Sequence, residues 1–158
     1  MKKNLLVCVM AAAAVFTLTG CGDKKEENKE EGTTTAKQEQ KLQCSQTVEG
    51  DTLKFSFTFE DDKISKVTMT STEKKKDEKT AKKEYEQNSK NVGEYNKNKG
   101  VTASASYSGT LVTNSVTFTV ANLDDTSKVL YNELFEEIAD KNMESIKSDL
   151  TGAGYTCK

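Results

Sequence analysis

The sequence predicts an α+β fold, with a mainly antiparallel sheet of about five to six strands and helices packed on one face. Three observations lead to this fold class. Residues 52–60 alternate strictly between apolar and polar side chains, and shorter segments on either side repeat that period of two. The C-terminal third instead carries apolar residues at helical spacing. Strict alternation is typical of an antiparallel sheet with one packed face and one solvated face, so the helices should cover the packed face.

The clearest strand covers residues 52–60 and should carry an aromatic row on its packed face. Polar Lys54, Ser56 and Thr58 lie between the apolar positions and should face solvent. Gly50-Asp51 and Asp61-Asp62 at the two ends predict turns. The apolar residues that should share one face are Leu53, Phe55, Phe57 and Phe59.

Alternation also predicts four further strands and a short terminal strand. The first begins at Lys41, the fourth and fifth are separated by a bend at Gly109, and residues 155–158 are short enough for an edge strand. The residues expected on the packed face are Leu42, Cys44 and Val48 of the first strand, Val67 and Met69 of the third, Val101, Ala103, Ala105 and Tyr107 of the fourth, and Val116, Phe118 and Val120 of the fifth.

Residues 73–100 are polar, with a thin apolar stripe at helical spacing. A helix is expected from about Asp77 to Gly100, with a break at Gly93, because glycine inside a helix costs about 1 kcal/mol relative to alanine. Asn88 interrupts the stripe. The residues of the stripe are Ala81, Tyr85, Val92 and Tyr95.

Two shorter helices are expected near the C-terminus. The first begins at an N-cap within Asp124-Asp125-Thr126, and the second begins at Asn142 and ends at Gly152. The apolar face of the first should consist of Leu130, Leu134 and Ile138, with Tyr131 and Phe135 beside them, and that of the second of Met143, Ile146 and Leu150.

The N-terminal segment predicts an exported, lipid-anchored protein. Lys2 and Lys3 precede an apolar run over residues 5–17, which is too short to span a bilayer and is typical of a secretory signal peptide. The run ends in Leu18-Thr19-Gly20-Cys21, which resembles the bacterial lipobox. In proteins with that motif the cysteine receives a diacylglyceryl group, and cleavage before it leaves palmitate-type acyl chains on the new N-terminus. Cys21 is therefore the expected lipid attachment site. The alternative is an uncleaved signal anchor with a chance cysteine.

These features divide the chain into three parts. Residues 1–20 form the signal peptide, and residues 21–40 form the lipidated cysteine and a charged tether, which has too few apolar side chains to offset its ordering entropy. Residues 41–158 form a single α+β domain. The expected location is the extracytoplasmic face of the bacterial cell membrane.

Composition disfavours catalysis and nucleic-acid binding. The chain contains no histidine, tryptophan or proline, and all of its 23 cationic side chains are lysines. The usual general base, the usual zinc ligand and the bidentate phosphate clamp are therefore missing. The net charge of −2 gives no electrostatic footprint for nucleic acid. We expect no enzyme activity, no catalytic residue, no cofactor and no metal site.

Two cysteines remain once Cys8 leaves with the signal peptide and Cys21 carries lipid. Cys44 lies in the first strand and Cys157 is the last-but-one residue. Outside the reducing cytosol the two can form a disulfide that joins the beginning of the domain to its end. Two free thiols are the alternative. A redox-catalytic role is disfavoured because no C-x-x-C spacing is present.

Two carboxylate pairs are candidate calcium ligands. Asp61-Asp62 and Asp124-Asp125 lack the spaced oxygens and central glycine of a calcium loop, so turn and cap chemistry is the favoured interpretation. The tyrosines could line a groove but fall at core-facing positions, which favours the edges of the core. They are Tyr85, Tyr95, Tyr107, Tyr131 and Tyr155.

The chain resembles the YehR-type small bacterial lipoproteins, a family without an assigned function. The likeness covers the lipobox, the charged tether, Leu42-Gln43-Cys44, the strand-turn-strand over residues 55–69, the lysine-rich helix with Gly100-Val101, and the ending Gly154-Tyr155-Thr156-Cys157. The resemblance implies an α+β fold and an extracytoplasmic lipoprotein, and it supplies no catalytic residue. The expected function is a non-enzymatic surface module that binds a small ligand or a protein. The alternative is a structural or accessory envelope protein within a larger complex.

Overall fold

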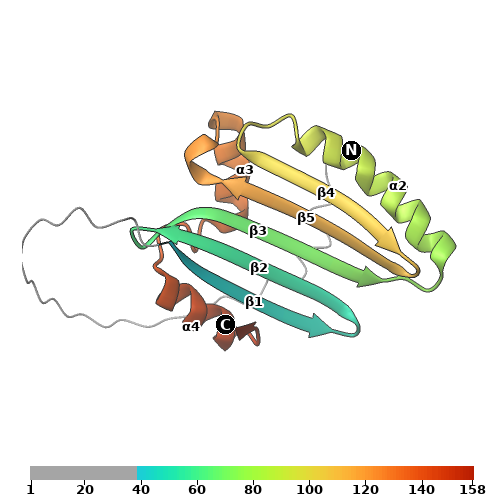
Figure 1. Cartoon of the computed structure of the whole chain (residues 1–158), viewed down its shortest axis with the longest axis horizontal. Helices are drawn as coiled ribbons and strands as arrows, with labels where there is room; N and C mark the ends of the chain where they lie inside the picture. Colours follow the sequence, from blue (N-terminus) through green and yellow to red (C-terminus); the bar gives the residue numbers. More distant parts are fainter. Residues whose placement is uncertain (1–38) are drawn as a thin grey trace, which may run out of the picture.

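Six antiparallel strands form one sheet in the part of the chain that the computed structural model describes, residues 39–158 (Figure 1). The strands are β1 (Gln40–Val48), β2 (Asp51–Glu60), β3 (Lys63–Lys74), β4 (Val101–Ser108), β5 (Leu111–Thr119) and β6 (Thr156–Cys157). The helices are α2 (Glu78–Tyr95), α3 (Asp125–Phe135) and α4 (Met143–Gly152), with a short 3-10 helix η1 (Val120–Asn122). The order across the sheet is β4-β5-β3-β2-β1-β6, which confirms the predicted fold class.

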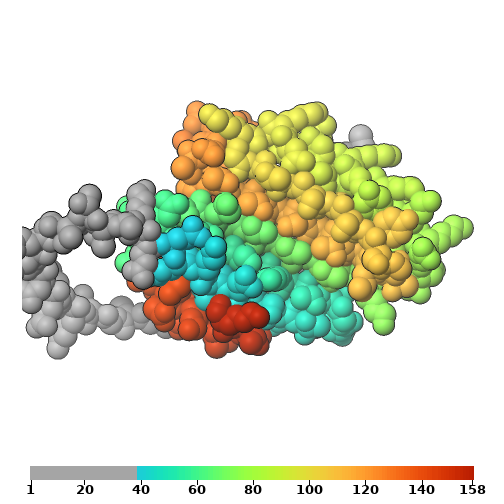
Figure 2. All heavy atoms as spheres, viewed as in Figure 1, coloured from blue at the N-terminus to red at the C-terminus, as the bar shows by residue number. Residues whose placement is uncertain are grey.

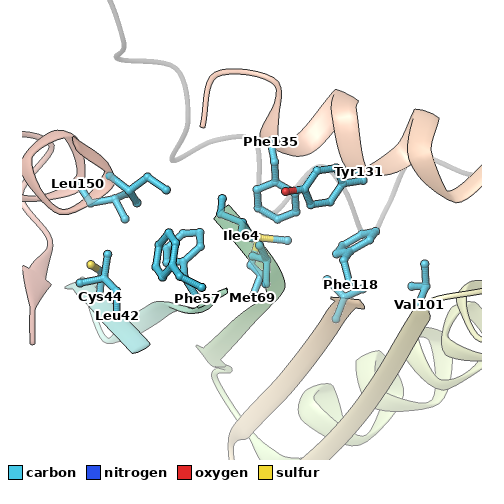
Figure 3. Packing of buried hydrophobic residues seen from close by; sticks show 14 of the residues in the cluster. Leu42, Cys44, Phe57, Ile64, Met69, Val101, Phe118, Tyr131, Phe135 and Leu150 are labelled. Atoms are coloured by element: carbon cyan, nitrogen blue, oxygen red, sulfur yellow. The ribbon is translucent and has the colours of Figure 1, made fainter. Parts of the chain in front are cut away.

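The apolar residues of the strands gather on one face of the sheet, and all three described helices pack there. Phe57, Phe59 and Val67 are fully buried, as the alternation predicted, whereas Leu53 and Phe55 are half-buried. Phe118 of β5 lies edge-on to Tyr131 and Phe135 of α3, with ring centroids 5.8 and 5.6 Å apart. Figure 3 shows these two rings above Phe118, and Leu150 of α4 above Leu42 and Cys44. The core is therefore a single layer between the sheet and the helices.

Tight turns set the register of the β1–β2 and β2–β3 hairpins. Glu49 and Gly50 connect the first pair with φ values of 54° and 93°, and Asp61 and Asp62 connect the second with 51° and 60°. Positive φ at both central residues matches the right-handed twist of the flanking strands. The turn at Asp61-Asp62 is confirmed, while the turn expected at Gly50-Asp51 lies one residue earlier.

Two expectations for α2 are wrong. The helix runs through Gly93 without a break and ends at Tyr95, well before Gly100. Val92 and Tyr95 pack against the core on either side of Gly93, so tertiary contacts outweigh its low propensity. Gly100 has a different role: at φ +79° a Cβ there would lie 2.7 Å from the backbone of Asn122.

The buried face of α3 also differs from the expectation. Tyr131, Phe135 and Ser127 are its buried residues, whereas Leu130, Leu134 and Ile138 are only partly buried beside the core. The aromatic rings turn toward Phe118, and this contact orients the helix. The caps of the two C-terminal helices at Asp124 and Asn142 are confirmed, as is the burial of Ile146 and Leu150.

Two valines do not occupy their predicted positions. Val48 is 58% exposed at the end of β1, opposite Asp51 beside the hairpin turn. Val120 lies in η1 rather than in β5, because the chain leaves the sheet after Thr119.

Each edge of the sheet is partly closed by local hydrogen bonds. On β4, the amide group of Asn96 binds both backbone groups of Ala103, accepting from its N–H at 2.6 Å and donating to its carbonyl at 3.1 Å. The N–H of Val101 donates to the carbonyl of Asn98. An edge strand satisfied in this way offers fewer free groups for pairing with another chain.

At the other edge the C-terminus pairs with β1. Cys44 lies opposite Cys157 in the register, with a sulfur–sulfur distance of 2.01 Å and a Cα–Cα distance of 4.1 Å. The backbone groups of Gln43 and Lys158 exchange two hydrogen bonds of 3.0 and 2.9 Å. This geometry is consistent with the expected disulfide, and it holds β6 and the end of α4 against the sheet.

We predict that loss of this covalent bond destabilises the domain strongly. Cys157→Ser, which leaves the buried Cys44 in place, should lower the free energy of unfolding by about 4–5 kcal/mol, because the bond closes a long loop in the unfolded chain. Urea denaturation with and without reductant measures the effect. A reductant should destabilise the wild type similarly and leave Cys157→Ser unchanged. A wild type whose urea midpoint does not respond to reductant would contradict the prediction.

Candidate functional site

The face of the sheet opposite the helices, here called the open face, is the candidate site. Figure 2 shows strand residues across the middle of this face, with helix residues at its margins. All of its side chains are at least partly exposed. The open face includes Lys41, Gln43, Ser45 and Thr47 of β1, Thr52, Lys54, Ser56 and Thr58 of β2, Lys66, Thr68, Thr70, Thr72 and Lys74 of β3, Leu111, Thr113, Ser115, Thr117 and Thr119 of β5, and Thr102, Ser104, Ser106 and Ser108 of β4.

The strand register aligns these residues into three rows that cross the sheet from β4 to β1. The central row is Ser104, Ser115, Thr70, Lys54 and Ser45. The rows on either side of it are Thr102, Thr117, Thr68, Ser56 and Gln43, and Ser106, Thr113, Thr72, Thr52 and Thr47. Adjacent strands lie about 4.8 Å apart, so each row spans about 19 Å.

Hydroxyl groups on neighbouring strands pair with one another within these rows. Three pairs join β3 to β5, and one pair joins β1 to β2. The pairs are Thr68 with Thr117 at 2.9 Å, Thr70 with Ser115 at 3.1 Å, Thr72 with Thr113 at 3.1 Å, and Thr47 with Thr52 at 3.0 Å. A hydroxyl has one donor and two acceptor lone pairs, so each pair keeps one donor and several lone pairs for a ligand or water.

The charges on the open face are unevenly placed. Lys54 stands in the central row, and neither Lys54 nor Lys66 forms an ion pair with any residue of the described range. Lys41 pairs with Glu39 at 2.8 Å at the margin. The three rows contain no carboxylate. The middle of the face is therefore rich in hydroxyl groups and weakly basic.

The two carboxylate pairs have structural roles, as predicted. Asp61 and Asp62 form the β2–β3 turn. Asp124 caps α3, where its Oδ1 accepts from the Ser127 N–H at 2.8 Å and the Ser127 hydroxyl at 2.6 Å. These bonds, the hydroxyl bond above all, lower the pKa of Asp124. Within residues 39–158, no three histidine, cysteine or acidic side chains are grouped so that they could hold a metal ion.

One further titratable cluster lies outside the open face. Lys75 binds Glu73 at 2.6 Å and Glu84 of α2 at 2.8 Å. Burial lowers the pKa of Lys75, but the hydrogen bonds and charges of the two carboxylates outweigh it and raise the pKa to about 12. This cluster joins the end of β3 to α2, which is a structural role.

The tyrosines lie at the edges of the core, as favoured from the sequence. Tyr131 and Tyr155 are buried. Tyr85 of α2 contacts Tyr107 of β4, with ring centroids 5.1 Å apart, and Tyr155 contacts Phe55 at 5.7 Å. Burial raises the pKa values of Tyr131 and Tyr155. These rings stabilise packing between elements.

Of the sequence-predicted site residues, the structure brings Cys44 and Cys157 together. Cys21 lies outside the described residues, as do the signal peptide and nearly all of the tether. No helix within residues 39–158 has the length and hydropathy needed to cross a membrane. The sequence predicts only that the threonines and serines of the strands face solvent. Their alternation was visible, but their assembly into rows depends on the strand order.

Comparisons with known proteins support the fold. The sequence matches no protein-family model, and it matches no curated protein. The NMR structure of a protein from Streptococcus pneumoniae TIGR4 is similar with a TM-score of 0.60 and 16% identity, covering 92% of this chain and 99% of that one. The NMR structure of the E. coli YehR protein is similar with a TM-score of 0.58 and 15% identity, covering 78% and 93%. The chain therefore has a YehR-like fold.

We predict that the Asp124 cap contributes acid resistance. The folded pKa of Asp124 lies below its unfolded value, so its contribution to stability is present above the unfolded pKa and is lost as pH falls through the folded pKa. Ser127→Ala removes the hydroxyl donor and should raise the pKa of Asp124 toward its ordinary value. An NMR titration of the Asp124 carboxyl measures this. An unchanged pKa would contradict the role of Ser127.

We also predict that the open face tolerates loss of a hydroxyl group. Thr70→Val should change the free energy of unfolding by less than about 1 kcal/mol, because a cross-strand pair contributes little and valine favours strands. The reverse change Val67→Thr, at a fully buried position of the same strand, should lower the free energy of unfolding by about 1–3 kcal/mol. Urea denaturation compares the two. An equal loss of stability in the two variants would contradict the prediction.

Proposed function

We propose that this protein is a lipid-anchored, extracytoplasmic, non-enzymatic binding module whose open face contacts its partner. The observation that supports this proposal most directly is the alignment of exposed hydroxyl groups into rows across β1 to β5. Folding requires that this side of the sheet be polar, but it does not require such a concentration of serine and threonine. Paired hydroxyls with unused donors and acceptors form a surface suited to polar recognition.

The anchor is proposed from the N-terminal sequence. Leu18-Thr19-Gly20-Cys21 resembles the lipobox, and the YehR-like fold fits the lipoprotein family that the sequence resembles. The Cys44–Cys157 pairing is compatible with an oxidising, extracytoplasmic compartment. An anchor at Cys21 with the folded domain beginning near β1 leaves the open face available outside the membrane.

The absence of catalysis is proposed from composition and from the chemistry of the open face. Histidine and arginine are missing from the whole chain, and the rows contain hydroxyl, amide and ammonium groups without a base to activate them. A serine or threonine hydroxyl is a weak nucleophile unless an adjacent base takes its proton. The rows are therefore suited to binding rather than to reaction.

Lipidation at Cys21 is tested by intact-mass spectrometry of the native protein from its membrane. The mature chain should begin at Cys21 and carry the mass of a diacylglyceryl group. Cys21→Ser should abolish the modification and move the protein from the membrane fraction to the soluble fraction. An unmodified wild-type chain that still begins at Met1 would contradict the anchor.

The use of the open face is tested by site-specific photo-crosslinking in intact cells. A photoreactive residue at Ser104, which is exposed on the open face, should give crosslinked products. The matched control is the same residue at Glu133, which is exposed on α3. Products from Glu133 and none from Ser104 would place the contact on the helices and overturn the proposal.

A further inference from the structure

We propose that the open face binds an anionic, hydroxyl-bearing polymer, a chain of phosphodiester-linked polyols, lying across the strands. This inference rests on the proposed function and names the class of its ligand. It is carried by charge complementarity in the central row and by the positions of the carboxylates around it.

Lys54 supplies the positive charge at the centre. Its side chain is exposed, it has no ion-pair partner in the described range, and the register places it between Ser45 and Thr70. Thr52 and Ser56 flank it on its own strand. A phosphodiester oxygen can accept from the Lys54 ammonium group and from these hydroxyls together, and charge-assisted bonds of this kind are stronger than neutral ones.

The hydroxyl rows match the rest of such a polymer. A polyol unit between two phosphates presents hydroxyl groups, which both donate and accept. The pairs Thr70–Ser115 and Thr68–Thr117 each keep a free donor and free lone pairs toward solvent. In a polymer that crosses from β1 to β4, a phosphate would therefore contact Lys54. The polyol units would contact the serine and threonine hydroxyl groups along about 19 Å of the row.

The positions of the carboxylates favour a polymer that crosses the strands from β1 to β4 over a membrane surface as the ligand. Glu49 and Asp51 lie at one end of the β1–β2 hairpin, where the Lys74 side chain is close to Gly50, and Asp61 and Asp62 form the turn at the opposite end of β2, before Lys63. A flat anionic bilayer covering the whole face would meet exposed carboxylates at both ends. A single polymer chain crossing the middle rows avoids them. Lys66 lies beside its path, where it also faces Glu39, whose pKa is lowered by Lys41 above all and by Lys66.

The test uses the full lipidated protein in detergent and a synthetic poly(glycerol phosphate) as the probe. Binding is measured by titration calorimetry, with neutral dextran as the matched uncharged polyol. The wild type should bind the phosphate polymer, and its affinity should fall as the salt concentration increases. Its affinity for dextran should be at least about tenfold weaker, since a charge-assisted hydrogen bond contributes roughly 1.5–3 kcal/mol.

Two variants locate the contact. Lys54→Gln should weaken binding about tenfold or more, because it removes the central charge. The control Lys82→Gln removes an exposed lysine on α2 and should leave binding unchanged within a factor of about two. Thr70→Val should weaken binding while the fold persists, which the NMR spectrum checks.

Three results would overturn the proposal. These are equal affinity for dextran, equal affinity of Lys54→Gln and wild type, and Lys54-dependent binding to phosphatidylglycerol vesicles that exceeds binding to the polymer. In each case, crosslinks from Ser104 in cells would still support the open face as the binding surface, so failure of the ligand class is distinguishable from failure of the proposed function.

Discussion

Burial of the aromatic row of β2 is the interaction on which the rest of the structure depends. Phe57 and Phe59 are fully buried, and successive side chains of a strand point to opposite faces. Burying them therefore holds Lys54, Ser56 and Thr58 on the opposite side, toward solvent. Because β1 and β3 pair with β2 in register, their side chains are sorted in the same way. One apolar face and one open face follow from this one constraint.

The helices and the C-terminal strand complete the packing on the apolar face of the sheet. The aromatic rings of α3 close over Phe118, and α4 covers the β1 side of the core, where Leu150 lies over Leu42. The two-residue β6 lies beside β1, where buried Tyr155 and the Gln43–Lys158 hydrogen bonds help to hold the C-terminus. The Cys44–Cys157 bond adds a covalent constraint at this edge, while the Asn96 amide occupies backbone groups of Ala103 at the other. The open face is thus bounded by edges with few free pairing groups.

The hydroxyl groups of the open face are compatible with both stability and recognition. Threonine favours strands because its branched side chain packs well on a pleated surface. Its hydroxyl group keeps the surface hydrated, and Lys54 and Lys66 add charge that opposes aggregation of the sheet. Since cross-strand hydroxyl pairs contribute little to stability, substitutions on the open face should leave the fold intact, which the opposite face maintains.

The sequence alone determined the fold class, the helix caps at Asp124 and Asn142, and the burial of Phe57 and Phe59. These features arise from neighbours a few residues apart, through alternation or through a side chain bonding the next turn of backbone. The lipid anchor at Cys21 remains a prediction from the same local pattern.

The tertiary structure decided what depends on distant partners. The strand order β4-β5-β3-β2-β1-β6 set the hydroxyl rows, since period two specifies which face a residue takes but not which strand lies beside it. Because Tyr131 and Phe135 contact Phe118, they form the buried face of α3 in place of Leu130 and Leu134. Packing of Val92 and Tyr95 against the core stabilises α2 on both sides of Gly93, so the helix continues through this residue. Each outcome required the free energy of contacts between segments far apart in the chain, which no local pattern contains.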